Sequence, residues 1–492
     1  MPDIYRRSMD GNAAGDSVPF HHGGKYHLFH LSVPGDSLGQ QYPYRCTTEQ
    51  RHAISEDLVT WREAPTALVP GEAYDKDGCW TGSIVEKDGT YYLFYTGHTA
   101  GAENPQTICL ATGTDGETFE KSPNNPLLRP DPKLYESIDF RDPYIFWNEE
   151  EQTYWMLIAA RLATGPVGLR GVVALSTSED LLSWTAPEPF YSPYSTFCPE
   201  CPEMFKLGEW WYLVYSHFSE SMRTTYRISR SPRGPWRTPP RPGLDGRRFY
   251  AAKSMPTDDP NRRLMWGSIY ERVGLSDDSD WTYAGDFGIA RELRSNSDGS
   301  LSVSIPAEIV NAFGQASPLD VQPKMGSWDV VGDSAKTDSV ATYSYAVAEL
   351  PEIDGAALLT ASVTPGDDGG EFGLLVRASD DLASTHALVF DPQGQRVTFS
   401  LIPQSLDPFW ESLTSRKVPA PQIDGPHLVE RPLAIAKGKT HNVQVILDGS
   451  LVEVFVDGEV ALSYRIYDEG ARNIGFFAQD NSVTFSNIGV AQ

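Results

Sequence analysis

The strongest constraint on the fold is a repeat: short aromatic runs recur along the first 300 residues, each entered through a polar turn. Their anchors lie 65, 63, 57 and 54 residues apart, at Tyr26, Tyr91, Tyr154, Trp211 and Met265. A repeat of about 50–65 residues with several short strands is typical of a β-propeller blade. The five anchors predict five blades. An irregular β-sandwich is the alternative, but a second strand-and-turn element follows most anchors in matched phase and argues against it.

The pattern changes after about residue 310, where polar and apolar residues alternate with period two. Examples are SYAVAEL (344–350), FGLLVRAS (372–379) and LVEVFVDG (451–458). Short alternating strands joined by turns predict a β-sandwich. We therefore expect an all-β chain, with a five-bladed propeller over residues 1–310 and a sandwich over 311–492. We expect the sandwich to be structural; a carbohydrate-binding module is the alternative, for which Phe409-Trp410 is the obvious aromatic cluster.

The net charge of the chain limits the classes of molecule that it is expected to bind. Asp and Glu total 66 against 40 Lys and Arg, a formal net charge of -26. This charge repels nucleic acid and anionic membranes, so we expect neither as a partner. No apolar stretch reaches bilayer length, and residues 1–20 lack the apolar core of a signal peptide, so we expect a cytoplasmic protein, or a secreted one if the sequence is trimmed. We expect a monomer or homodimer.

Three of the predicted blades carry an acidic residue 10 to 12 positions before the anchor: Asp16, Asp142 and Glu200. Thr81 holds this place in the second blade. Equivalent positions of the innermost strands face the central channel of a propeller. We therefore predict that the three carboxylates share one phase of the repeat and converge at one end of the axis.

Converging carboxylates point to a particular chemistry. Their mutual repulsion and the Phe and Pro residues beside them should raise at least one pKa. One protonated and one ionised carboxyl group are the minimum equipment for hydrolysis of a glycosidic bond. The structural alternative, in which each acid serves a turn or pairs with Arg141, explains any one of them but not all three in phase.

Several motifs carry a resemblance to a known family. FRDPYIF (140–146) resembles the Arg-Asp-Pro motif and ECPEMF (200–205) the Glu-Cys motif of glycoside hydrolase family 32, the β-fructosidases. WTGS (80–83) and FYAAKSM (249–255) are similar to two further elements, and the tail (448–467) resembles the closing sandwich signature. The resemblance covers nearly the whole chain in order.

The resemblance implies a propeller, a sandwich and a retaining double displacement. It implies Asp16 as nucleophile, Glu200 as general acid and base, and Asp142 as the residue that stabilises the transition state through sugar hydroxyls. Its motifs also place four residues in substrate binding: Trp80, Ser83, Arg141 and Tyr250. It implies no metal and no cofactor.

The segment around Asp16 departs from the family pattern Trp-Met-Asn-Asp-Pro-Asn-Gly. Gly15 replaces the Asn before the Asp, Ser17-Val18 replace the Pro-Asn after it, and Leu31 replaces a later Gln. A site that loses buried polar groups changes which hydroxyls it can satisfy. We therefore expect a short fructo-oligosaccharide or a difructose anhydride, rather than plain sucrose, with water or a second sugar as acceptor. His21 or His22 could fill the vacated role, but turn histidines exposed to solvent are the simpler interpretation.

Three other readings stay open. One is an inverting furanosidase of the related five-bladed class, with arabinose- or xylose-containing substrates. Another is a sugar-binding propeller without catalysis. The Cys198-Pro-Glu-Cys201 segment also raises zinc or redox chemistry, but no second pair of ligands follows it.

Overall fold

The computed structural model describes residues 4–34, 48–219, 222–339, 345–353, 355–382, 385–402, 409, 427–467 and 473–492. The chain divides into two compact units. One comprises Asp3–Glu271 and Trp281–Ser302, and the other Arg272–Asp280 and Val303–Gln492. The division falls a few residues before the predicted boundary at 310/311, and the 272–280 loop belongs to the second unit.

The first unit is the five-bladed propeller. Its first three groups of strands are β1 (Ala13–His22), β2 (Lys25–Val33), β3 (Glu49–Ser55) and β4 (Trp61–Glu63), then β5 (Gly78–Lys87), β6 (Thr90–His98), β7 (Gln106–Gly113) and β8 (Glu120–Lys121), then β9 (Tyr135–Asn148), β10 (Thr153–Leu162), β11 (Gly171–Ser178) and β12 (Glu188–Tyr191). The last two groups are β13 (Glu200–Leu207), β14 (Trp210–His217) and β15 (Arg223–Ser229), then β16 (Phe249–Pro256), β17 (Arg263–Arg272), β18 (Trp281–Phe287), β19 (Arg291–Ser295) and β20 (Leu301–Ser304).

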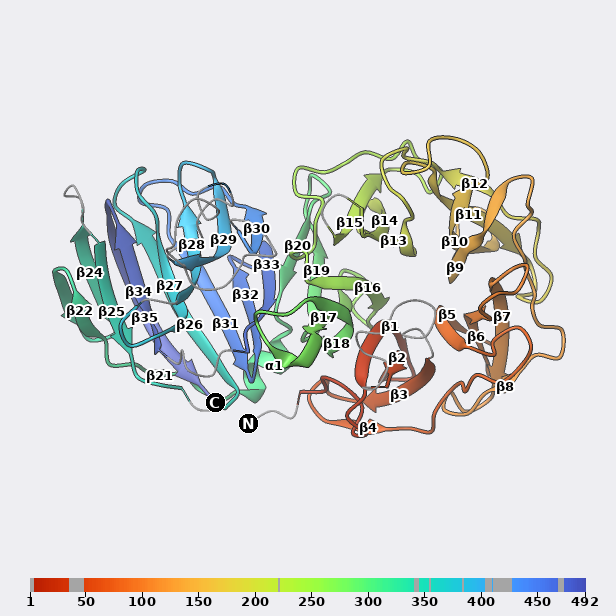
Figure 1. The fold of residues 1–492 in the computed structure, drawn as a ribbon, viewed down its shortest axis with the longest axis horizontal. Helices are drawn as coiled ribbons and strands as arrows, with labels where there is room; N and C mark the ends of the chain where they lie inside the picture. The colour runs from red at the N-terminus through yellow and green to blue at the C-terminus, as the bar shows by residue number, and fades with distance from the viewer. Residues whose placement is uncertain are drawn as a thin grey trace. The chain divides into compact units, whose positions relative to one another are not determined.

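Figure 1 shows these groups following one another around a ring, with β1, β5, β9, β13 and β16 on its inner side. Strand β18 pairs with both β17 and β1, so the fifth and first groups form one continuous sheet that closes the ring. This arrangement confirms the predicted all-β fold of a five-bladed propeller followed by a sandwich.

The polar turns read from the sequence are tight hairpins. Gly23 and Gly24 connect β1 to β2, and Asp88 and Gly89 connect β5 to β6; all four have positive φ. Two residues with positive φ form the turn whose twist matches that of paired strands. The aromatic run after each turn is the second strand of a blade, buried on both faces between neighbouring blades.

The propeller core lies between successive blades. Leu93 and Tyr95 pack with residues of the first blade, while Phe94 packs with Met156 and other residues of the third. Trp211 contributes to the cluster between the third and fourth blades. Because each aromatic strand fills two inter-blade layers, the repeat of aromatic anchors is a direct consequence of blade stacking.

The second unit contains a short 3₁₀ helix (Val273–Leu275), the helix α1 (Ala307–Ala312) and two antiparallel sheets. One sheet consists of β21 (Ser317–Pro318), β23 (Trp328–Val331), β24 (Ser334–Ser339), β26 (Ala357–Pro365), β31 (His441–Asp448), β32 (Leu451–Val456), β33 (Val460–Arg465) and β35 (Asn481–Ala491). The other consists of β22 (Gln322–Met325), β25 (Tyr345–Leu350), β27 (Phe372–Ala378), β28 (Thr385–Asp391), β29 (Arg396–Ile402), β30 (Val429–Pro432) and β34 (Asn473–Gln479).

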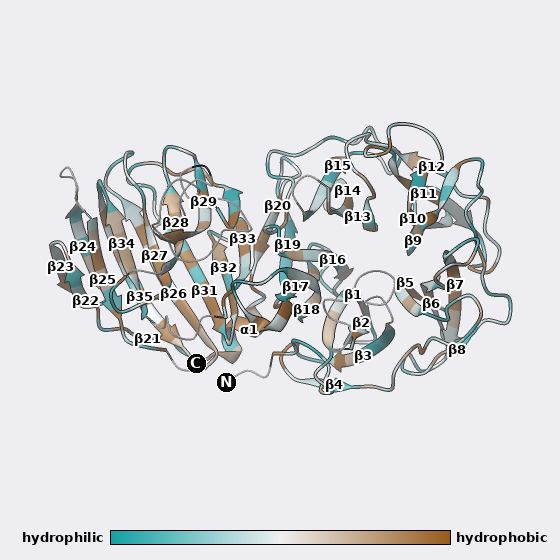
Figure 2. Ribbon diagram, in the orientation of Figure 1, coloured by the Kyte–Doolittle hydropathy of each residue, from teal (hydrophilic) through white to brown (hydrophobic). Residues whose placement is uncertain are grey.

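The two sheets of this unit enclose an apolar core. Phe476 of β34 stacks on Phe485 of β35, with ring centroids 4.3 Å apart, so the contact crosses from one sheet to the other. In Figure 2 the hydrophobic positions, in brown, lie mainly on the strands, and the loops are largely hydrophilic, in teal and white. Phe409 is 62% exposed, whereas Trp410, the other residue of the proposed aromatic cluster, lies outside the described residues. Within the described part of the chain, no helix is long and apolar enough to cross a membrane.

Candidate active site

A bulge recurs at the same level in all five innermost strands. In each strand two consecutive residues face one residue of the neighbouring strand, at positions 15–16, 81–82, 142–143, 201–202 and 251–252. The first residue of the pair has a positive φ at Asp142, Cys201 and Ala251. A β-bulge bends its strand and re-aims side chains, and is often found beside active sites. The five bulges together shape one end of the channel.

The three predicted carboxylates occupy three successive positions of this bulge. Glu200 precedes the pair, Asp142 is the first residue of its pair, and Asp16 is the second of its own. The prediction that they share a single phase is therefore wrong, because counting residues to the aromatic anchor does not detect an extra residue in the strand.

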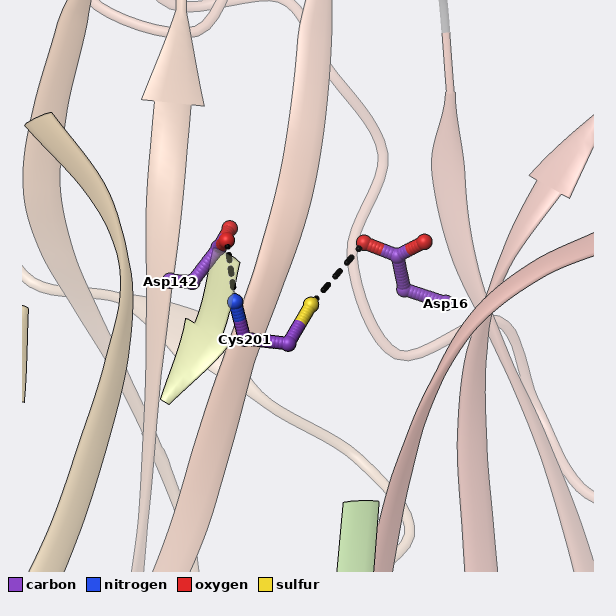
Figure 3. Close-up of side chains that lie close together, drawn as sticks. All are labelled: Asp16, Asp142 and Cys201. Carbon is purple, nitrogen blue, oxygen red and sulfur yellow. Dashed lines mark hydrogen bonds between the residues drawn. The ribbon is translucent and has the colours of Figure 1, made fainter. Parts of the chain in front are cut away.

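Cys201 joins two of the carboxylates. Its backbone amide donates to Asp142 Oδ2 at 2.9 Å, and its thiol donates to Asp16 Oδ2 at 3.5 Å. Figure 3 shows Cys201 between the two acids, with one interaction on each side. The predicted convergence is therefore present for Asp16 and Asp142.

Asp16 lies in a shell of hydrogen-bond donors. Thr81 Oγ1 donates to Asp16 Oδ2 at 2.5 Å, and the Tyr283 hydroxyl donates to Asp16 Oδ1 at 3.0 Å. With the Cys201 thiol, three neutral donors therefore surround the Asp16 carboxyl group and engage both of its oxygens.

Glu200 has a different environment, dominated by a buried cation. Arg141 Nη2 donates to Glu200 Oε1 at 2.7 Å, while the Tyr250 hydroxyl donates to Glu200 Oε2 at 2.5 Å. The Arg141 guanidinium also donates to Asp139 at 2.5 Å and to Gln106 at 3.1 Å. This network fixes the Glu200 side chain, which remains 21% exposed.

Burial perturbs two of the three carboxyl groups in the same direction. Burial raises the pKa of Glu200, and the opposing effect of Arg141 does not cancel it. Burial raises the pKa of Asp142 to about 7, with further contributions from the negative charges of Asp16 and Glu200 and opposition from Arg141. The clustered carboxyl groups therefore hold a proton at pH values above the usual range for Asp and Glu. This agrees with the prediction from the sequence that at least one pKa is raised.

Three of the four predicted substrate-binding residues hold the same position as Glu200, directly before the bulge: Trp80, Arg141 and Tyr250. Trp80 is half-buried and stacks on His98, with ring centroids 4.0 Å apart. Ser83 lies farther along β5, where its hydroxyl accepts a hydrogen bond from the Ile145 backbone amide at 2.9 Å. There it lines a cavity of about 370 Å³, together with residues such as Tyr144 and Lys253.

Asp16, Asp142 and Cys201 also form a group whose potential ligand atoms lie within 4.8 Å of one another. Burial, together with the two neighbouring carboxylates, raises the pKa of the Cys201 thiol well above its usual range. A metal ion binds the thiolate form of cysteine. The protonated thiol thus fits its observed role as a donor to Asp16 better than that of a ligand.

The residues that replace the family pattern near Asp16 have structural partners. The Ser17 hydroxyl donates to the Trp266 carbonyl at 2.9 Å, and Leu31 is buried opposite the bulge. His21 and His22 lie at the far end of β1 and do not fill the vacated role: their rings approach Asp258 and Glu86. The sequence did not single out Thr81 or Tyr283 as site residues, although the repeat placed Thr81 at a position equivalent to the acids, and it raised Cys201 only as part of a possible zinc or redox pair.

Clustered carboxyl groups, two of them with a raised pKa, at one end of a five-bladed propeller are typical of a glycosidase site. The family model described as "Glycosyl hydrolases family 32 N-terminal domain" matches residues 16–304, and the model of the C-terminal domain of the same family matches residues 324–492. The chain belongs to glycoside hydrolase family 32 and is a glycoside hydrolase of the β-fructofuranosidase type. This assignment replaces the inverting furanosidase and the non-catalytic propeller considered above.

Individual relatives agree with the assignment. The chain is 30% identical over 445 residues to the sucrose-6-phosphate hydrolase of Escherichia coli, with 85% of this chain and 80% of the relative covered. It is 28% identical to the raffinose invertase of the same species, with coverage of 92% and 87%. Among solved structures, exo-inulinase from Aspergillus awamori superimposes with a TM-score of 0.74 at 19% identity, covering 100% of this chain and 98% of the other, and supports the fold.

Proposed function

We propose that the protein hydrolyses the fructosyl bond of a short, neutral, fructose-containing saccharide with retention of configuration. Asp16 attacks the anomeric carbon while Glu200 protonates the departing oxygen, so that the glycosidic bond breaks and a fructosyl ester of Asp16 forms. Water then attacks that carbon while Glu200 removes its proton, releasing fructose and free Asp16. A sugar hydroxyl in place of water gives fructosyl transfer.

The observation that carries this proposal is the contrast between the two carboxyl groups. Asp16 accepts hydrogen bonds from Thr81 and Tyr283, whereas burial raises the pKa of Glu200. A nucleophile needs the first environment and an acid catalyst the second. In this proposal Asp142, deep in the site beside both, binds sugar hydroxyls.

The choice of substrate rests on charge and on the altered segment around Asp16. A net charge of -26 opposes a phosphorylated sugar, although one relative bears the name sucrose-6-phosphate hydrolase. Gly15 and Leu31 lack the polar groups that the family pattern places there, which favours a short fructo-oligosaccharide or a difructose anhydride over sucrose. Other relatives are named fructan 1-exohydrolases.

A product assay tests the proposal. The panel comprises sucrose, sucrose 6-phosphate, short inulin- and levan-type oligosaccharides and difructose anhydrides, with Asp16→Asn and Glu200→Gln as matched blanks. We expect fructose or transfer products from a neutral oligosaccharide and none with Asp16→Asn. Turnover of sucrose 6-phosphate alone would overturn the substrate class, and near-normal turnover by Asp16→Asn would overturn the mechanism.

A further inference from the structure

The Tyr283 hydroxyl reaches Asp16 from the strand that closes the propeller. Strands β18 and β1 are antiparallel, with Ala14 opposite Gly285. Two residues before Gly285 on β18, Tyr283 reaches the bulge of β1, where its hydroxyl donates to Asp16 Oδ1 at 3.0 Å. The contact is therefore built into the pairing of the fifth blade with the first.

Gly15 leaves the space in which this hydroxyl lies. A Cβ atom added at Gly15 would lie 3.0 Å from the Tyr283 hydroxyl and 3.0 Å from Leu31 Cβ. Both distances are too short for comfortable packing. The absence of a side chain at position 15 and the hydrogen bond from Tyr283 are thus two aspects of one arrangement.

The Tyr283 ring is also held in place. It packs edge-on against Tyr270, with centroids 5.6 Å apart, and Tyr270 packs against Tyr250 at 5.9 Å. Tyr250 in turn donates to Glu200. Three aromatic rings on β16, β17 and β18 therefore connect the donor for Asp16 with the donor for Glu200.

We propose that Tyr283 is a positioning residue for Asp16, and that Gly15 is required to admit its hydroxyl. Thr81 and Cys201 both engage Asp16 Oδ2. The Tyr283 hydrogen bond holds the other oxygen, Oδ1, and so adds a second point that resists rotation of the rigid carboxylate about its Cβ–Cγ bond. Rate depends steeply on such orientation, because small misplacements of a reacting group are costly.

The kinetic test rests on the proposed function of Asp16 as nucleophile and uses whichever fructoside the wild-type enzyme turns over. Tyr283→Phe keeps the ring and removes only the hydroxyl. We expect kcat to fall about 10- to 100-fold, with little change in KM or in the thermal midpoint. Unchanged kcat would overturn the proposal, and so would a raised KM at normal kcat, which would indicate direct sugar binding instead.

A double-mutant cycle with Gly15→Ala tests the second half of the proposal. The added methyl group should displace the hydroxyl, so Gly15→Ala should lower kcat in the wild-type background and much less in Tyr283→Phe. Effects that simply multiply would contradict a shared mechanism. Tyr212→Phe is the matched control: its hydroxyl bonds Ser295 at 2.7 Å in a different part of the propeller, and we expect normal kcat.

An infrared measurement separates this inference from the proposed function. The wild-type spectrum minus that of Asp16→Asn isolates the carboxylate stretch of Asp16 without any need for turnover. We expect this band to shift in Tyr283→Phe and Gly15→Ala and not in Tyr212→Phe. A shift in a protein inactive on every fructoside would leave the hydrogen bond supported and the proposed function overturned; no shift would overturn the positioning role.

Discussion

Glu200 and Glu203 lie three residues apart on β13, and burial raises the pKa of both side chains. Glu203 is 0% exposed and accepts two hydrogen bonds from Ser254, one from the backbone amide at 2.8 Å and one from the hydroxyl at 2.9 Å. The Glu200 side chain is 21% exposed and accepts from Arg141 and Tyr250.

The two acids differ in whether their hydrogen-bond networks leave the carboxyl group accessible. Ser254 is itself held by Arg263, whose Nε donates to the serine hydroxyl at 2.9 Å, so Glu203 belongs to a closed network. Glu200, by contrast, remains partly exposed directly before the bulge. A perturbed pKa therefore does not by itself distinguish a structural acid from a functional one, whereas partial exposure beside other carboxyl groups does.

We expect the largest effect from substitution of Glu200, the partly exposed acid of the pair. Glu200→Gln should lower kcat about 10²- to 10⁴-fold, the usual contribution of a general acid, because the amide cannot protonate the leaving oxygen. The fold should persist, since the amide can still accept from Arg141 or Tyr250. Steady-state kinetics with circular dichroism checks this. With a fructoside whose leaving group departs without protonation, azide, which needs no general base, should speed the second step and yield a fructosyl azide; failure of both predictions would remove Glu200 from the mechanism.

The next largest effect is expected from substitution of Glu203, the fully buried acid of the pair. Glu203→Gln replaces one acceptor oxygen by an amide donor that faces Ser254, so one buried hydrogen bond is lost. We expect a loss of about 1–3 kcal/mol in the free energy of unfolding and a kcat within a few-fold of wild type. Thermal and denaturant unfolding beside the kinetics measure both. A large loss of kcat with unchanged stability would mean that the comparison assigns the two acids the wrong way round.

The sequence predicted the fold well because blade stacking demands an aromatic strand in every repeat and sandwich strands demand period-two alternation. The convergence of Asp16 and Asp142 was predicted because both lie shortly before the aromatic anchor of a blade, on the innermost strand. The bulge was not predicted, because its positive φ falls on Asp142, Cys201 and Ala251, none of them glycine. A conformation that bulkier residues adopt leaves no clear signature in the sequence.

Contacts between distant strands escaped prediction for a second reason. Tyr283 lies 267 residues from Asp16, and their hydrogen bond depends on the register with which β18 closes the ring. Hydrophobic patterns specify which face of a strand is buried but not which strand of another blade lies opposite. Gly15 was read from the sequence only as a lost polar group, whereas the structure shows a partner in the vacated space.

The smallest effect is expected from substitution of Asp142, and it concerns how the stability of the protein depends on pH. An ordinary aspartate loses its proton near pH 4 in the unfolded chain, but the pKa of Asp142 in the folded protein is about 7. Between these values the folded state binds more protons than the unfolded state, so this group's contribution to stability is full below about pH 4 and declines as the pH rises towards about 7. Asp142→Asn removes that contribution and keeps an acceptor for the Cys201 amide.

The measurement is the difference in thermal midpoint between wild type and Asp142→Asn in a pH series from about 4.5 to about 7.5, a range set by this linkage. We expect the variant to gain on the wild type as the pH rises. Asp115→Asn is the control, because hydrogen bonds from the backbone amides of Thr118 and Glu117 lower the pKa of Asp115 to about 2, outside the series. Its difference from wild type should stay constant. A constant difference for Asp142→Asn as well would show that Asp142 is ionised throughout, and that Arg141 outweighs its burial.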